Sequence, residues 1–103
     1  MTYQVIISDV AEMDIVDTGL YISEELSAPD AADNLLDEID QQILSLEQMP
    51  KRFALVSDER LAQQGIRLIP VRNYLILYFV EDYSKTVTIA RVLYGKRNWL
   101  HLL

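Results

Sequence analysis

The last part of the chain holds the residues whose types and spacing best suit chemistry. Residues 91–101 read RVLYGKRNWLH, which places three cations, two aromatic rings and the only histidine close together. Guanidinium and ammonium groups bind phosphate oxygens and aromatic rings stack on bases, so this segment suits contact with a nucleic acid. The alternative is structural: solvated basic residues, with Trp99 and Leu102 anchoring the end of the chain to the core.

Two further arginines stand where folding would bring them near this segment. Arg67 lies in an expected strand and Arg72 in the turn after it, while Arg91 alternates with Val87 and Ile89 along a later strand. Side chains two positions apart in a strand point to the same side of the sheet. We therefore expect the folded strands to gather several of these cations on one side.

Several other kinds of site are disfavoured by what the sequence contains. There is no cysteine, and the single histidine, His101, cannot form a histidine-based metal site alone. Asp33, Asp37 and Asp40 share an expected helix face, but such acidic faces are usually just solvated. There is no glycine-rich phosphate loop and no Gly-x-Ser-x-Gly turn. We expect neither a metal nor a small-molecule cofactor.

Charge is distributed unevenly along the chain. Residues 1–50 contain 12 acidic residues and no Lys or Arg, whereas residues 51–103 contain all nine basic residues and four acidic ones. The net charge of −7 hides this difference. One half of the molecule could meet an anion while the other repels one; the plainer interpretation is that the carboxylates form solvated helix faces.

A β-meander is predicted to position the basic residues. Residues 66–71, 74–81 and 86–93 are rich in β-forming side chains, and the short links between them favour antiparallel hairpins. Pro70 cannot donate a ladder hydrogen bond, which places its strand at an edge. Residues 3–8 predict one more strand.

Two helices are expected between the first strand and the meander. Asp9 and Glu12 form a capping-box signature at the start of a helix over residues 9–26, within which Gly19 indicates close approach of a neighbour. Ser27 is expected to cap a second helix, which Pro50 ends. Its core face is predicted from the helical spacing of Ala32, Leu36, Ile39, Ile43 and Leu46. So short a link predicts an antiparallel helical hairpin.

The length of 103 residues suits one α+β domain over residues 1–103. Residues 1–8 contain no Lys or Arg and no long apolar run, which argues against a signal peptide. No stretch of the sequence is apolar enough over the length that a bilayer requires. We therefore expect a cytoplasmic protein.

The sequence resembles the RelE/ParE family, the toxins of bacterial type II toxin–antitoxin systems. The resemblance is carried by the segments LIPVRNYLILY at residues 68–78 and VTIARVLYGKRNW at 87–99, and the two helices and the loop over 53–67 fit the family layout. It implies a strand, a helical hairpin and a three-strand meander. The first strand would complete one antiparallel sheet, with the hairpin packed on one face.

The resemblance implies a growth-inhibiting toxin that a cognate antitoxin neutralises, by one of two mechanisms. RelE-like members cleave mRNA on the ribosome, and the catalytic residues would then be Arg97, Lys96 and His101. ParE-like members poison DNA gyrase and block replication. This chain has Leu75 where RelE-like nucleases usually carry another arginine, and it is acidic, so we favour the ParE-like mechanism.

A third interpretation is a family-fold protein that binds its partner without being toxic. In each case the predicted partners are an antitoxin and, for a toxin, either gyrase or the ribosome with its mRNA. The predicted target-binding residues are Arg67, Arg72, Arg91, Tyr94 and Trp99.

Overall fold

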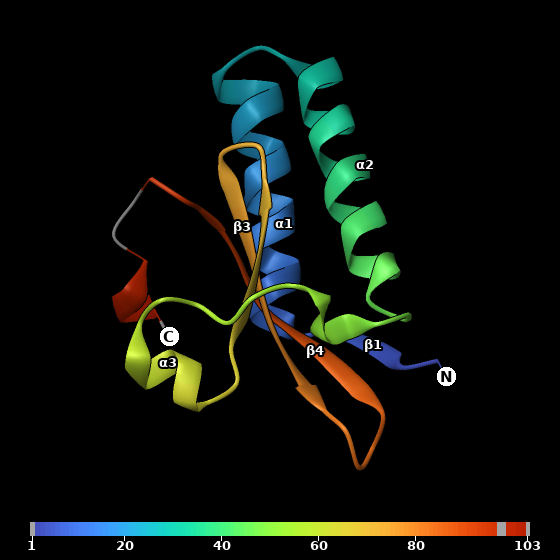
Figure 1. Cartoon of the computed structure of the whole chain (residues 1–103). Helices are drawn as coiled ribbons and strands as arrows, with labels where there is room; N and C mark the ends of the chain where they lie inside the picture. Colours follow the sequence, from blue (N-terminus) through green and yellow to red (C-terminus); the bar gives the residue numbers. More distant parts are fainter. Residues whose placement is uncertain (1, 97–98, 103) are drawn as a thin grey trace.

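A four-stranded sheet carries two antiparallel helices on one face (Figure 1). A computed structural model describes residues 2–96 and 99–102, apart from the side chain of His101. The helices are α1 (Asp9–Leu20), which continues as a π-helical turn (Tyr21–Glu25), α2 (Pro29–Ser45) and the short α3 (Glu59–Gln63). The strands are β1 (Gln4–Ile7), β2 (Arg67–Val71), β3 (Tyr74–Glu81) and β4 (Thr86–Tyr94), and 3₁₀ turns occur at Pro50–Arg52 and Leu100–Leu102. The predicted α+β fold with a helical hairpin on one face is confirmed.

The sheet is mixed, and the prediction of a wholly antiparallel sheet was wrong in this respect. Its strand order is β1-β4-β3-β2. Strands β2, β3 and β4 form the predicted antiparallel meander, with Pro70 on the edge strand, but β1 runs parallel to β4. Tight turns force the chain to reverse between consecutive strands. The helical hairpin that follows β1 imposes no such reversal, so its packing decides the direction of β1.

Both helices are capped differently from the prediction. Ser8, not Asp9, caps α1, because its Oγ accepts a hydrogen bond from the Ala11 amide at 3.1 Å. The same hydroxyl donates to the Ala90 carbonyl at 3.1 Å and so ties the helix start to β4. Ser27 does not cap α2; it has a φ of 50°, and the helix starts at Pro29 without a side-chain cap. Pro29 suits this position because its fixed φ matches a first helical turn.

Each face of the sheet is covered by its own core. The larger core lies between the sheet and the helical hairpin and includes Ile39 and Ile43 of α2 and Tyr78 of β3. The smaller core lies on the opposite face, where Leu77 and Leu93 pack beneath α3 and the C-terminal turn. The close approach predicted at Gly19 is confirmed, since a Cβ there would lie 3.0 Å from Cδ1 of Leu36.

Candidate functional site

Arg91 is bound to an acidic residue of the helical hairpin. Its Nε and Nη2 donate to the two carboxylate oxygens of Asp14 at 2.8 and 2.9 Å, and its Nη1 donates to the Leu102 carbonyl at 3.3 Å. Both side chains are largely buried. The hydrogen bond to Asp14 raises the pKa of Arg91. This cation is therefore held within the protein as part of a bidentate pair.

Arg67 is held by the backbone of the loop that precedes β2. Its Nη1 donates to the Phe53 carbonyl at 2.6 Å and to the Lys51 carbonyl at 3.3 Å. In the sheet Arg67 pairs with Tyr78, whose ring belongs to the core under the helices, whereas Arg91 pairs with Leu77, whose side chain belongs to the other core. Directly paired residues share a face of the sheet. The structure therefore places Arg67 and Arg91 on opposite faces, and the expectation that they gather on one side was wrong.

Arg72 also has an acidic partner. It occupies the β2–β3 turn with a φ of 55°, and its Nη2 and Nε donate to Glu38 of α2 at 2.6 and 3.1 Å. Both side chains of this pair are about half-exposed. A bidentate pair at the surface remains accessible to competing anions, so Arg72 is less firmly committed than Arg91.

The aromatic residues of the C-terminal segment lie in different surroundings. Trp99 is partly buried and packs with Leu102 against the smaller core, which confirms the structural alternative for these two residues. Tyr94 ends β4, is 39% exposed and meets Tyr74 edge-on, with ring centroids 5.5 Å apart. Lys96 is exposed. Arg97 and the side chain of His101 lie outside the described residues, so their predicted roles stay predictions.

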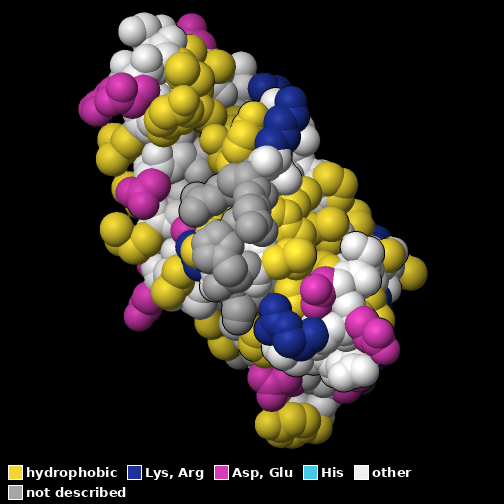
Figure 2. Space-filling model, turned by 90° about the vertical axis from the view of Figure 1, so that its left-hand side faces the viewer, with side chains coloured by type: hydrophobic (Ala, Val, Ile, Leu, Met, Phe, Trp, Pro, Cys, Tyr) yellow, Lys and Arg dark blue, Asp and Glu magenta, His cyan; other side chains and the backbone are white. Residues whose placement is uncertain are grey.

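Few basic side chains in the described part of the chain are without a partner. Arg60 and Lys96 form no ion pair and no side-chain hydrogen bond there. Lys51 pairs with Asp82, and Lys85 lies over the ring of Tyr3. In the face shown in Figure 2, Lys and Arg side chains are seen in separate places. Most basic side chains of the described residues are therefore engaged within the protein.

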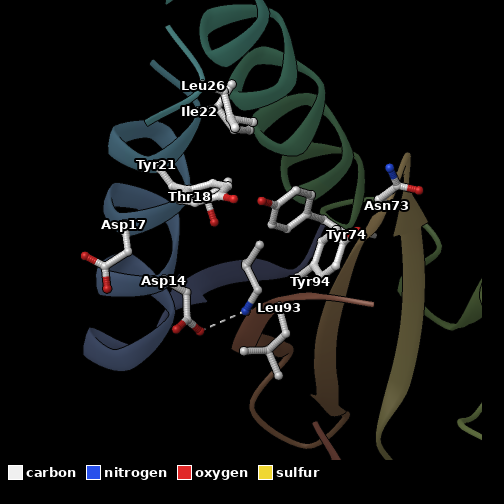
Figure 3. A pocket seen from close by; sticks show the side chains of 11 residues that line it. Asp14, Asp17, Thr18, Tyr21, Ile22, Leu26, Asn73, Tyr74, Leu93 and Tyr94 are labelled. Carbon is white, nitrogen blue, oxygen red and sulfur yellow. Dashed lines mark hydrogen bonds between the residues drawn. The ribbon is translucent and has the colours of Figure 1, made fainter. Parts of the chain in front are cut away.

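A cavity that sequence reasoning missed opens between the helical hairpin and the ends of β3 and β4 (Figure 3). Its volume is about 650 Å³. The lining residues are Asp14, Asp17, Thr18, Tyr21, Ile22, Leu26, Asn73, Tyr74, Val92, Leu93 and Tyr94. Three tyrosines are brought together from separate elements, and burial raises the pKa of Tyr74. No local sequence pattern predicts this cavity, because its lining residues come from three segments that are distant in the sequence.

An apolar stripe on α1 leads to the cavity. Val10, Met13, Leu20 and Tyr21 are each between 50% and 58% exposed. Spacings of three, four and seven residues place Asp17 within the same helix face, among these apolar side chains. Asp17 is therefore a carboxylate set within this apolar stripe, while the exposed Asp9 and Glu12 lie nearer the start of the helix.

Within residues 2–96 and 99–102, no group of three or more His, Cys, Asp and Glu side chains is placed to hold a metal ion. In the same part of the chain, no helix has both the length and the apolar character needed to cross a membrane.

Comparisons with known proteins give one consistent family. Residues 5–99 match the family model described as ParE toxin of type II toxin–antitoxin system, parDE. A search of the curated proteins finds no significant match. Among solved structures, the chain is similar to the chromosomal ParDE toxin–antitoxin system from P. aeruginosa, with a TM-score of 0.74 and 18% identity over 92% of this chain and 98% of that one.

Two RelE-type structures share the fold as well. A mutant of the E. coli toxin RelE in the free state gives a TM-score of 0.71 at 13% identity, over 99% of this chain and 93% of that one. The toxin–antitoxin complex RelBE2 from Mycobacterium tuberculosis gives a TM-score of 0.66 at 21% identity, over 91% and 92%. Since the family model spans nearly the whole sequence and the sheet and hairpin match these structures, the chain belongs to the ParE toxin family of type II toxin–antitoxin systems.

Proposed function

We propose that this protein inhibits growth by poisoning DNA gyrase, without cleaving RNA, and that a cognate antitoxin holds it inactive. The choice of mechanism rests on one observation: three arginines already have hydrogen-bond partners within the protein. Arg91 and Arg72 are bound to carboxylates, and Arg67 is bound to backbone carbonyls. These side chains serve the fold, which leaves few cations for a phosphate in a reaction.

An RNA-cleaving site needs free cations around the phosphate at which charge develops. Such a site must activate a 2′-hydroxyl, stabilise the charged transition state and protonate the leaving oxygen. Leu75 occupies the β3 position where RelE-like nucleases usually carry an arginine, and its side chain lies against Gly95, 3.1 Å from where a Cβ would stand. At this position the chain therefore has an apolar side chain where a nuclease would carry a charge.

The antitoxin partner is supported by the family and by exposed apolar surface. The similar structures include toxin–antitoxin complexes. The apolar stripe on α1 is the kind of surface that a segment folding on binding can cover. Co-expression of the chain with the product of an adjacent small gene, followed by pull-down and a growth assay, tests this part. Recovery of the chain alone, with growth unaffected, would favour a protein that is not toxic.

The mechanism is tested by inducing the chain alone in growing cells. We expect stalled replication and DNA-damage signalling, inhibition of supercoiling by the purified protein, and no new mRNA ends within codons. Arg97→Ala is the variant that separates the mechanisms, because a group acting on the chemical step is needed for cleavage but not for binding. Codon-specific mRNA cleavage on programmed ribosomes, abolished by Arg97→Ala, would replace the gyrase proposal with the RelE-like one.

A further inference from the structure

Asp17 stands where an exposed apolar surface meets the tyrosine-lined cavity. It lies on α1 within the apolar stripe of Val10, Met13, Leu20 and Tyr21, and it also lines the cavity. Figure 3 shows Tyr74 and Tyr94 on the sheet side of this space and Tyr21 on the helix side, while Asp17 stands at its edge with its carboxylate directed away from Tyr74 and Tyr94. A carboxylate set among apolar side chains gains from a cation that arrives with its own apolar surface.

The cavity lining selects for positive charge. It contains the rings of Tyr21, Tyr74 and Tyr94 and two carboxylates, and no Lys or Arg is among its lining residues. Asp14 is already engaged by Arg91 and by the Val92 amide, whereas Asp17 forms no ion pair within the described residues. Aromatic faces attract ammonium and guanidinium groups, and the remaining carboxylate adds to that attraction.

The negative charge of the whole helical hairpin also favours a positively charged partner. Residues 1–50 carry 12 acidic side chains and no basic one, so the potential around α1 is negative. An acidic or phosphorylated partner would be repelled from this face, and a basic one would be drawn to it.

We propose that the cavity is a docking pocket for one lysine or arginine side chain, which an amphipathic segment of the antitoxin presents while its apolar side chains cover the α1 stripe. This inference rests on the proposed antitoxin partner and assigns the chemistry of the contact. The aliphatic stem of the side chain would lie along Ile22 and Leu26, and its charged end would meet the tyrosine rings, with Asp17 at the edge of the cavity adding to the attraction.

The pocket itself is tested with small probes that do not depend on the antitoxin. The chain is made by cell-free synthesis, and the ring resonances of Tyr21, Tyr74 and Tyr94 are followed by NMR at fixed ionic strength. The probes are n-butylguanidinium and the neutral n-pentanol. We expect the cation to bind about fivefold more tightly than the alcohol, as expected for cation–π contact helped by one carboxylate.

Asp17→Asn should remove most of the preference for the cation and leave alcohol binding unchanged. The matched control is Asp33→Asn, a change of the same charge at an exposed position on α2 outside the cavity lining. Equal binding of n-butylguanidinium and n-pentanol by the unchanged chain would overturn the proposal. The proposal would also be overturned if Asp17→Asn and Asp33→Asn weakened n-butylguanidinium binding equally. Such a result would show that the cation responds to the net charge of the protein and not to the pocket.

The contact with the antitoxin is tested by reversing the charge of Asp17 in the co-expressed complex. Asp17→Lys should weaken antitoxin binding by about tenfold or more, because it opposes the incoming cation, while Asp33→Lys should change it far less. Equal affinities of the two variants would overturn the docking contact while leaving the antitoxin partnership intact. Failure of the unchanged chain to bind any antitoxin would overturn the proposed partner and with it this occupant, while the probe titration would still decide the preference of the pocket.

Discussion

Asp14 of α1 and Arg91 of β4 join the helical hairpin to the sheet at the place where β1 has ended. Strand β1 pairs with β4 only as far as Ile89, so the Val92 amide has no strand partner on that side. Oδ2 of Asp14 accepts from this amide at 3.0 Å, in addition to the bidentate contact with Arg91. One carboxylate therefore takes the place of a missing strand and neutralises the adjacent cation.

Removal of this carboxylate should destabilise the fold. The side chains of Arg91 and Asp14 are only 19% and 13% exposed, so Asp14→Ala leaves a poorly solvated guanidinium and an unpaired amide. We expect the free energy of unfolding to fall by about 2–4 kcal/mol, toward the lower end of the range for breaking a buried pair. Urea unfolding monitored by circular dichroism measures it.

The double variant Asp14→Ala, Arg91→Ala measures the interaction energy between the two side chains, as distinct from the contribution of each one alone. Its loss of stability should be smaller than the sum of the two single losses, because neither charge is left alone. Strict additivity would show that the two side chains act independently. Because Arg91 serves the fold, Arg91→Ala should reduce toxicity only as far as it reduces the amount of folded protein.

The two faces of α2 should respond differently to truncation. Ile43 is 3% exposed within the larger core, and its neighbour Leu44 is 61% exposed. Ile43→Ala should cost about 2–5 kcal/mol of unfolding free energy, as buried large-to-small changes do. Leu44→Ala should cost about 0.5 kcal/mol or less, like other surface changes. Similar losses at both positions would contradict the packing of α2 on the sheet.

The hydroxyl of Tyr78 links the centre of β3 to the loop after α2. It is fully buried and donates to the Pro50 carbonyl at 2.6 Å. Tyr78→Phe should cost about 1–2 kcal/mol at neutral pH, because it removes a hydrogen bond and leaves the carbonyl unpaired. Thermal and urea unfolding check this value, with the exposed Tyr83→Phe as the matched control.

The same residue predicts a loss of stability at alkaline pH. Burial raises the pKa of Tyr78 above its ordinary value of 10.0, although Arg67 opposes the shift. In the unfolded chain the hydroxyl ionises first, so above pH 10 the folded state binds more protons than the unfolded state. This contribution is complete below pH 10 and is lost as the pH rises through the higher folded pKa. The pH dependence of unfolding above pH 10 should be shallower for Tyr78→Phe, and an unchanged slope would contradict the argument.

Gly19→Ala should stabilise the protein only when the side chain of Leu36 is also shortened. Alanine favours a helix over glycine by about 1 kcal/mol, but its Cβ would lie 3.0 Å from Cδ1 of Leu36. The two effects should nearly cancel, so Gly19→Ala alone should change the unfolding free energy by less than about 0.5 kcal/mol. In a Leu36→Ala background the same change should stabilise by about 1 kcal/mol. An equal gain in both backgrounds would show that the helices do not constrain this position.

The sequence alone was enough for the elements and for much of the core. Period-two and helical apolar patterns predicted the meander and the hairpin because burial of one face requires those spacings. Pro70 predicted its edge strand correctly because a missing N–H is tolerated there. The caps of the helices were predicted less accurately, because Ser8 and Asp9 are both good caps and only the backbone geometry decides between them.

Only the tertiary structure decided where the charged and aromatic side chains meet. Composition shows nine cations after residue 50, but not that Arg91 and Arg72 would find Asp14 and Glu38 in the first half of the chain. The direction of β1 and the tyrosine-lined cavity depend likewise on segments that lie far apart in the sequence. Local patterns reflect the burial of each element by itself, whereas ion pairs and cavities depend on how the elements pack against one another.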